Sequence, residues 1–442
     1  MVRRYSDLSI TIASWTRKLS WSLLLLGLAI ASPSWSQQID RVEIVETPKV
    51  DRDRGTVKLR LKVYGLNNRP IAGFQETDFQ VMIDCPENGD CPVLNESNLI
   101  DWKNPQEAEP PESFTIVLLD LSGSMSYQDT GGTPKLSGAL EAIKQFNQDL
   151  AKRSANNSHI AIVPFGESGR GCSPGQGNYP VTETELDNFL LAGDAKLNSY
   201  FDYLINQLDR LCASTNIYEP LSKAVRFLGN SEDPRFHPPE NSNRPQPRLS
   251  ILLLSDGYHN RPKEAEDFAT LISLLKRHPK ITVHTLGYGL TPEELGKKCG
   301  LGKPMTRDDL SRCSGAVKAE DFVDKQRLTE IAGETGGIAA FSGNAQNIAA
   351  DLLEFLNALL GEYEIIYSHP QIDRAELHEV RVKVTSQDGS TATAEAPYTI
   401  PWVAPSLSRS TRVKIVFFAI GGMAIGGVLP FWLWRRSIES KY

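Results

Sequence analysis

The segment FTIVLLDLSGSM, Phe114–Met125, restricts the fold of this chain more than any other. Apolar and β-branched residues run unbroken over Phe114–Leu119, which predicts a strand that is buried on both faces of a parallel sheet. The strand leads into a glycine-containing loop that carries Asp120, Ser122 and Ser124. Hard cations such as magnesium prefer oxygen ligands, and side chains at alternate positions can converge on one point. The loop is therefore predicted to supply part of a metal site.

Strand and helix patterns alternate from Phe114 to about Gly361, which is typical of a parallel sheet covered on both faces. A capping residue followed by proline, at Thr133 and Pro134, predicts the start of the first helix. Because parallel strands end at the same edge of a sheet, the loops that follow them are expected to meet there.

Two further segments complete the predicted site. Thr215 stands just before a predicted helix over Tyr218–Leu228, and Asp256 follows a predicted strand over Leu249–Leu254. With this order of elements, all three loops fall at the carboxyl edge of the sheet. Five oxygen ligands from separate segments then surround one cation: Asp120, Ser122, Ser124, Thr215 and Asp256.

This ordered set resembles the metal-ion-dependent adhesion site of the von Willebrand factor type A (VWA) domain: Asp-x-Ser-x-Ser, then Thr before a helix, then Asp after a strand. The resemblance covers residues 113–361 and implies a Rossmann-like, doubly wound α/β fold. It also implies that Mg²⁺ is bound, with Mn²⁺ or Ca²⁺ as alternatives. By the same resemblance, the two serines bind the ion directly and Thr215 does so in the ligand-engaged state, while Asp120 and Asp256 act partly through water. Only two carboxylates contribute charge, so an Asp or Glu of a protein ligand can supply the open position.

Each of these residues also has an ordinary structural interpretation. Asp120 fits a turn, the two serines fit caps of backbone amides, Thr215 fits a helix N-cap and Asp256 fits a turn. Each interpretation is the more frequent one for a residue taken singly. The occurrence of all five at one edge in the right order favours the metal site. His259, three residues beyond Asp256, is interpreted as a solvated loop residue rather than a ligand.

The segments on either side of the α/β region alternate apolar and polar residues, as half-buried strands do. We expect residues 37–84 and 362–401 to pair into one antiparallel β-sandwich. Within them, Asn68–Asp84 is similar to the strand pair that precedes this kind of domain in many bacterial exported proteins, and Tyr363–Ile400 resembles the strands that follow it. Residues 85–112 are rich in Pro, Asn and Glu and are predicted to form a linker.

The two ends of the chain carry targeting signals. Residues 1–36 have the pattern of a secretory signal peptide, because basic residues precede a short apolar run and small residues precede the expected cleavage site. Residues 413–434 are predicted to form a transmembrane helix between a juxtamembrane segment at 402–412 and a cytoplasmic tail at 435–442. The chain is therefore expected to be a single-pass type I membrane protein with a periplasmic or extracellular ectodomain. Gly422 and Gly426 form a GxxxG motif that suggests a homodimer, although small residues are common in such helices.

Six cysteines suit disulfides in an oxidising compartment. We expect the pairs Cys85–Cys91, Cys172–Cys212 and Cys299–Cys313, although other connectivities stay open. A zinc site is the alternative, but the CxxC and HxxxH spacings typical of one are absent from the sequence. The second and third pairs belong to insertions that follow strands, and these are expected to shape the rim of the binding face.

The remaining composition excludes several classes of function. The formal net charge is −7 and no basic stripe is present, so nucleic acid is not an expected partner. Motifs of metalloproteases, α/β-hydrolases and P-loop proteins are absent, which argues against an enzyme. We expect a membrane-anchored protein that binds a protein ligand through a divalent cation. The alternatives are an assembly factor of the cell envelope, an accessory subunit of an enzyme or transport complex, and a hydrolase with its site in the inserted loops.

Overall fold

The computed structural model describes most of the chain between the two predicted targeting segments. The predicted signal peptide lies outside the described residues, as do Gly422, Gly426 and nearly all of the span at 413–434. Within the described part, no helix has the length and apolarity needed to cross a membrane. The described residues are 38–399 apart from 52–53, 87–90, 155, 170–171, 174–175, 209–210, 240–243, 314–316, 318–321 and 370–375, together with 414, 417, 418, 432, 435 and 436.

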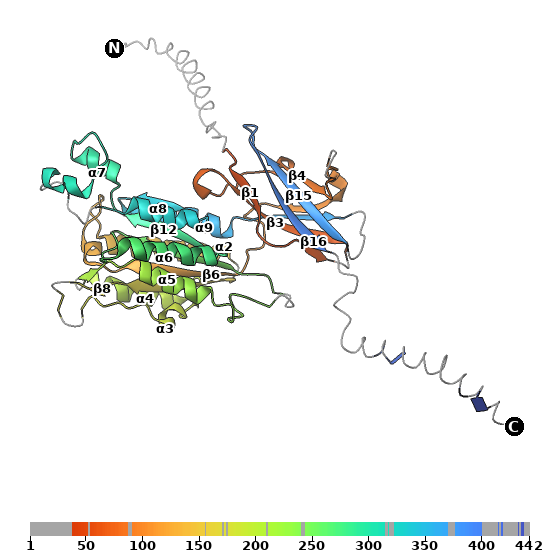
Figure 1. Cartoon of the computed structure of the whole chain (residues 1–442), viewed down its shortest axis with the longest axis horizontal. Helices are drawn as coiled ribbons and strands as arrows, with labels where there is room; N and C mark the ends of the chain where they lie inside the picture. The colour runs from red at the N-terminus through yellow and green to blue at the C-terminus, as the bar shows by residue number, and fades with distance from the viewer. Residues whose placement is uncertain are drawn as a thin grey trace, which may run out of the picture.

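A six-stranded sheet forms the centre of the α/β unit (Figure 1). Neighbouring strands are parallel except for the last pair, β7 and β9, which is antiparallel. The strand order is that of a doubly wound fold, and the direction of winding reverses between β6 and β11. In spatial order the strands are β13 (Ala339–Ser342), β12 (Ile281–Tyr288), β11 (Arg248–Ser255), β6 (Ser113–Asp120), β7 (Ser158–Phe165) and β9 (Leu190–Leu191).

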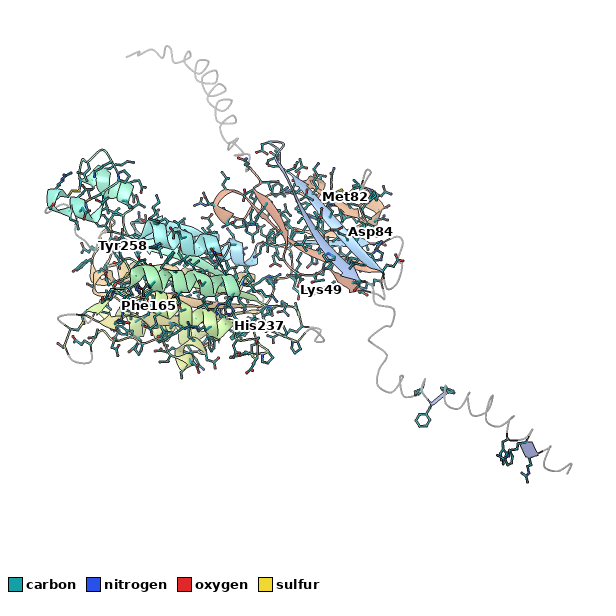
Figure 2. The ribbon with its side chains drawn as sticks, viewed as in Figure 1. Lys49, Met82, Asp84, Phe165, His237 and Tyr258 are labelled. Atoms are coloured by element: carbon teal, nitrogen blue, oxygen red, sulfur yellow. A yellow bond between two sulfur atoms is a disulfide. The ribbon has the colours of Figure 1, made fainter. Side chains whose placement is uncertain are left out.

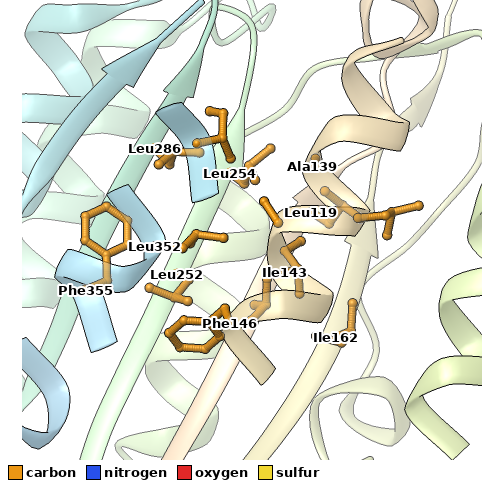
Figure 3. Packing of buried hydrophobic residues seen from close by; sticks show 14 of the residues in the cluster. Leu119, Ala139, Ile143, Phe146, Ile162, Leu252, Leu254, Leu286, Leu352 and Phe355 are labelled. Atoms are coloured by element: carbon orange, nitrogen blue, oxygen red, sulfur yellow. The ribbon is translucent and has the colours of Figure 1, made fainter. Parts of the chain in front are cut away.

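Helices cover both faces of this sheet, since every residue of the central strand β6 is buried. Val117 and Leu119 pack into one apolar cluster, part of which Figure 3 shows, and Ile116 and Leu118 pack into a second on the opposite face. The unbroken apolar run is thus explained by burial on two sides. The first cluster includes residues of α2 (Lys135–Arg153), α4 (Ala195–Ile205) and α9 (Ala345–Leu360); the second includes residues of α3 (Glu183–Leu186), α5 (Tyr218–Leu228), α6 (Glu264–Arg277) and α8 (Lys325–Glu334).

Two antiparallel sheets pack together into a β-sandwich beside the α/β unit (Figure 1). Strands from both ends of the described chain contribute to each sheet, so the α/β unit is inserted into the sandwich. One sheet has the order β1 (Arg41–Ile44), β3 (Thr56–Tyr64), β14 (Tyr363–Ser368), β5 (Leu99–Lys103), with β2 (Lys49–Asp51) paired to β3; the other has the order β16 (Thr391–Thr399), β15 (Leu377–Thr385), β4 (Phe79–Ile83). Short 3₁₀ helices η1 (Leu66–Asn68), η2 (Glu76–Asp78) and η3 (Glu96–Asn98) connect these strands.

Two local predictions differ from the structure. The segment predicted as a linker contains β5, which pairs with β14 and becomes part of the sandwich. Its residues are mostly half-exposed, so the strand lacks the apolar alternation that marks β3. The first helix begins at Lys135 with Pro134 at the N-cap position and no side-chain cap, so Thr133 does not cap it.

All three predicted disulfides are present: Cys85–Cys91, Cys172–Cys212 and Cys299–Cys313. The second lies beside a two-stranded sheet formed by β8 (Glu167–Ser168) and β10 (Ala213–Ser214). The third joins α7 (Pro292–Lys298) to η6 (Arg307–Cys313) through Cys299, the C-cap of α7. These insertions follow β7 and β12, so they extend from the carboxyl edge of the parallel sheet, where Figure 1 shows α7 projecting.

Candidate metal centre

The candidate site lies where the carboxyl ends of β6 and β11 meet. Asp120 is the last residue of β6, and Asp256 directly follows β11. The pairing of Leu119 with Leu254 brings both strand ends to the same height. The chain leaves β6 for α2 on one face of the sheet and leaves β11 for α6 on the other face. In doubly wound sheets, ligands bind in the crevice that forms at such a reversal.

Two serine hydroxyls converge on one carboxylate oxygen at this edge of the sheet. Ser124 Oγ donates to Asp256 Oδ1 at 2.8 Å, and Ser122 Oγ donates to the same atom at 3.3 Å. The two hydroxyl oxygens lie 3.0 Å apart. The 3₁₀ turn η4 (Gly123–Ser126) produces this spacing. In an octahedral Mg²⁺ site with bonds of about 2.0–2.1 Å, adjacent oxygens are about 2.9 Å apart, so the three atoms have the spacing of ligands to one ion.

Asp120 brings a second carboxylate into the same buried space. Its Oδ1 accepts a hydrogen bond from the Ser122 amide at 2.8 Å, and its Oδ2 accepts one from Ser255 Oγ at 2.6 Å. Asp120 and Asp256 are both fully buried. Burial, with a further contribution from the charge of Asp256, raises the pKa of Asp120 to about 7. Two carboxylates this close in a dry environment need positive charge near them.

Part of that charge comes from Lys135, which the sequence analysis missed. Lys135 is the first residue of α2 and is only 5% exposed, and its Nζ donates to Asp256 Oδ2 at 2.7 Å. A cation at a helix N-terminus interacts unfavourably with the helix dipole. The position of Lys135 at the start of a helix is therefore the sequence signal that could have indicated a buried acidic partner. One ammonium group facing two carboxylates leaves a net negative charge. The oxygen-only donor set and this charge therefore fit a hard divalent cation.

Thr215, the fifth predicted ligand, lies beside the other four predicted ligands. It is buried, and a Cβ placed on Gly257 would stand 3.1 Å from its Oγ1, so the hydroxyl lies against the residue that follows Asp256. The N-cap position of α5 is Ile217, which has no side-chain cap, so Thr215 is not the cap of this helix. The structure thus brings Asp120, Ser122, Ser124 and Asp256 into direct contact and Thr215 next to them.

The interpretation of His259 as a solvated loop residue is wrong. Its side chain is buried and stacks on Tyr218, with the ring centroids 4.1 Å apart. His259 Nδ1 accepts a hydrogen bond from the Ile217 amide at 3.3 Å. The histidine therefore supports the turn between Thr215 and α5. A single histidine in a loop shows no periodicity, so the sequence carried no sign of this packing.

The Cys172–Cys212 disulfide holds the rim beside the candidate site. Cys212 is three residues before Thr215, and Ala213 forms an isolated bridge with Ser122. A Cβ placed on Gly123 would approach Cys212 Cα to 3.6 Å. The loop after β7, the serine loop and the Thr215 segment are therefore linked at one edge.

Comparisons with known proteins return structural matches alone. No family model matches this chain, and no curated protein matches it. The matching structures include the pilus adhesin SpaC of Lactobacillus rhamnosus GG, at TM-score 0.35 and 12% identity over 83% of this chain and 48% of that chain. They also include the pilus adhesin RrgA of Streptococcus pneumoniae, at TM-score 0.20 and 13% identity over 49% of this chain and 24% of that chain.

A third match is the adhesive tip pilin GBS104 of group B Streptococcus agalactiae, at TM-score 0.18 and 14% identity over 57% of this chain and 41% of that chain. The chain spans less than half the length of each of these three proteins.

Proposed function

We propose that residues 113–361 form a VWA domain that binds a protein ligand through a divalent cation, with Mg²⁺ as the expected ion. The observation that carries the proposal is the convergence of the Ser122 and Ser124 hydroxyls on Asp256 Oδ1 at the reversal point of the sheet. In this proposal Ser122, Ser124 and Thr215 hold the ion directly. Asp256 orients the two serine hydroxyls and Asp120 holds the Ser122 amide, and both carboxylates act on the ion partly through water.

The charges around the proposed site favour an anionic ligand. When both buried carboxylates are ionised, they and the Lys135 ammonium carry one net negative charge, so a bound divalent cation makes the site positive overall. The bound ion supplies a Lewis-acidic position that accepts an oxygen of a partner's Asp or Glu. No catalytic chemistry is proposed. The serine hydroxyls donate hydrogen bonds to the carboxylates, and we assign no residue as a general base that would activate a hydroxyl or a bound water.

The proposed setting is the outside of the cell. The sequence pattern at 1–36 supports export, and the apolar segment at 413–434 supports a membrane anchor. Three disulfides in the ectodomain suit an oxidising compartment. A homodimer through Gly422 and Gly426 belongs to the same proposal.

Capture of envelope proteins by the immobilised full-length chain tests this function. With Mg²⁺ present, wild type is expected to retain a partner that EDTA releases, and Asp120→Ala and Ser124→Ala are expected to retain at least about tenfold less. Asp149→Ala, which removes a carboxylate from an exposed ion pair on α2, is the matched control and is expected to behave as wild type. Retention that persists in EDTA and in both site variants would refute cation-dependent binding and favour a docking role that is independent of metal.

A further inference from the structure

A second group of metal-ligand side chains lies in the β-sandwich. Asp84, His369 and His378 each present one ligand atom, and these atoms all lie within 4.8 Å of one another. Among the residues that the structure describes, no other three His, Cys, Asp or Glu side chains converge in this way. Figure 2 shows Asp84 in the sandwich and Phe165, the sheet partner of Asp120, in the α/β unit. The group is therefore separate from the candidate site above.

The three residues come from both sheets of the sandwich. Asp84 follows β4 and His378 is the second residue of β15, and these strands pair in one sheet. His369 directly follows β14, which belongs to the other sheet. An ion bound by all three side chains would therefore link the two sheets at one end of the sandwich.

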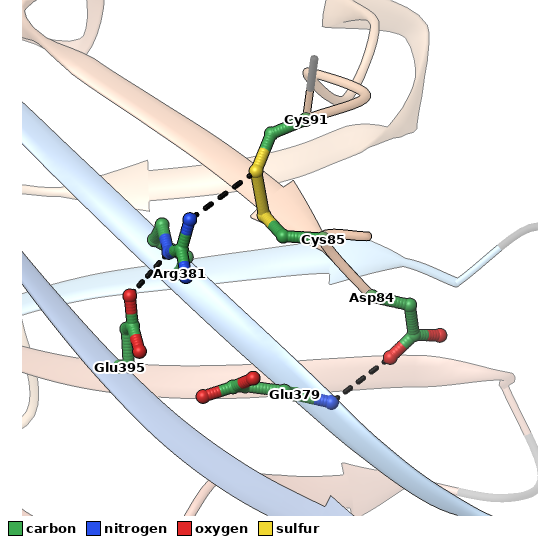
Figure 4. The surroundings of a disulfide bond; sticks show 6 residues. All are labelled: Asp84, Cys85, Cys91, Glu379, Arg381 and Glu395. Atoms are coloured by element: carbon green, nitrogen blue, oxygen red, sulfur yellow. Dashed lines mark hydrogen bonds and ion pairs between the residues drawn. A yellow bond between two sulfur atoms is a disulfide. The ribbon is translucent and has the colours of Figure 1, made fainter. Parts of the chain in front are cut away.

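Backbone contacts fix the carboxylate of Asp84. The Asp84 amide donates to the Glu379 carbonyl at 2.9 Å. The Glu379 amide donates to Asp84 Oδ1 at 2.9 Å, as Figure 4 shows. Asp84 Oδ2 lies 2.8 Å from His378 Nδ1. The Cys85–Cys91 disulfide clasps the chain immediately after Asp84. Because Oδ1 is held by the backbone, Oδ2 keeps its direction toward the histidines without depending on them.

The two imidazoles are buried and held by an aromatic neighbour. Their rings meet edge to face with centroids 4.6 Å apart. The hydroxyl of Tyr398 lies 2.9 Å from His369 Nδ1, and Tyr398 also pairs with His378 across β15 and β16. Metal-binding histidines commonly have one ring nitrogen held by such a partner, which sets the ring orientation. The Asp84 side chain is 46% exposed, so an ion can enter from the carboxylate side.

The donor set determines which metal fits. Two imidazoles and one carboxylate suit zinc-type ions and are poor ligands for magnesium. All six cysteines are in disulfides, so thiolates do not compete for such an ion. Ligand atoms of a tetrahedral zinc ion with bonds of about 2.0–2.1 Å lie about 3.3 Å apart. The three ligand atoms here all lie within 4.8 Å of one another, and Asp84 Oδ2 and His378 Nδ1 are 2.8 Å apart.

We propose that Asp84, His369 and His378 bind a divalent transition-metal ion of the zinc type, which joins the two sheets of the sandwich. Three protein ligands leave a further coordination position for water or a partner group on the exposed side. The proposal does not depend on the function proposed for the α/β unit.

Zinc titration into the full-length chain without an affinity tag, followed by calorimetry, tests this site. Wild type is expected to bind one equivalent of Zn²⁺, and excess Mg²⁺ is expected not to displace it. Asp84→Asn and His378→Gln are expected to weaken binding by at least about 100-fold, and Tyr398→Phe by about 10–100-fold, because it removes the contact that holds the His369 ring. His237→Gln, which alters a histidine of the α/β unit that contacts the Leu228 carbonyl, is the matched control and is expected to bind as wild type does.

Two further measurements distinguish a specific zinc site from weak binding elsewhere on the protein. Zn²⁺ is expected to raise the unfolding temperature of wild type. This measurement uses wild type alone, so it stays informative if a substituted protein does not fold. Asp120→Ala is expected to bind zinc with wild-type affinity. Loss of the proposed Mg²⁺ site would therefore leave zinc binding in the sandwich unchanged. Wild type without saturable zinc binding would overturn the proposal, and so would wild-type affinity in both Asp84→Asn and His378→Gln.

Discussion

Replacing Lys135 with methionine is expected to destabilise the metal-free protein by about 3–5 kcal/mol at neutral pH. The substitution removes the ammonium group that pairs with Asp256 at 2.7 Å and leaves two buried carboxylates without compensation. Methionine matches the length of the lysine stem, so the loss reports charge rather than a cavity. Urea unfolding in EDTA measures the effect.

The same variant is expected to bind Mg²⁺ at least about tenfold more tightly, because a nearby positive charge no longer repels the ion. Saturating Mg²⁺ should therefore recover much of the lost stability. Lys152→Met is the matched control on the same helix, since Lys152 pairs with Asp149 at an exposed position. We expect this control to change stability by no more than about 1 kcal/mol. An equally small loss in Lys135→Met would show that the ammonium does not compensate the carboxylates.

Replacing Glu362 with glutamine is expected to cost about 3–5 kcal/mol of unfolding free energy. Glu362 is 1% exposed and joins the end of α9 to β14. It pairs with Arg248 at 2.6 Å and with Arg60 at 3.3 Å, and Lys62 lies 3.9 Å away. Burial opposes its ionisation, but the charges of Arg248, Lys62 and Arg60 hold the pKa of Glu362 below its usual value. The glutamine would leave Arg248 and Lys62 buried without their carboxylate partner, whereas Arg60 would keep its ion pairs with Glu46 and Glu364.

The cluster around Glu362 also connects the two units of the protein. Arg248 begins β11 of the parallel sheet, whereas Arg60 belongs to β3 of the sandwich. We therefore expect the unfolding transition of Glu362→Gln to broaden or to split as the units uncouple. Glu293→Gln, which breaks an exposed pair with Lys325, is the control and should cost no more than about 1 kcal/mol. A single transition with an equally small cost in Glu362→Gln would contradict this account.

Local sequence patterns predicted those strands and helices whose residues are compatible with only one kind of secondary structure and burial. The unbroken apolar run of β6 needs burial on both faces, and the structure places helices against both. Helix α5 begins and ends at the predicted residues, Tyr218 and Leu228, because its apolar face repeats at helical spacing. The sequence also predicted that the loops after β6 and β11 meet at one edge of the sheet, and in the structure Asp120 and Asp256 lie together there. Their role as metal ligands stays a prediction.

Two side-chain contacts between distant segments were not accessible from the sequence. Lys135 pairs with a residue 121 positions away, and no local pattern distinguishes it from a solvated lysine except its place at a helix start. Asp84 and His378 are 294 positions apart and meet only because β4 and β15 become neighbours. Strand β5 was missed since its half-exposed residues show no alternation. These contacts and strand β5 depend on how distant segments pack together, and that packing is determined by the whole chain.

Calorimetric titration of Mg²⁺ into the full-length chain tests the central claim most directly. We expect wild type to bind one equivalent at the site of Asp120, Ser122, Ser124, Thr215 and Asp256. Asp120→Ala is expected to lose that binding, while its far-UV circular dichroism stays that of a folded α/β protein. Absence of Mg²⁺ binding in wild type, or unchanged binding in Asp120→Ala, would contradict the claim.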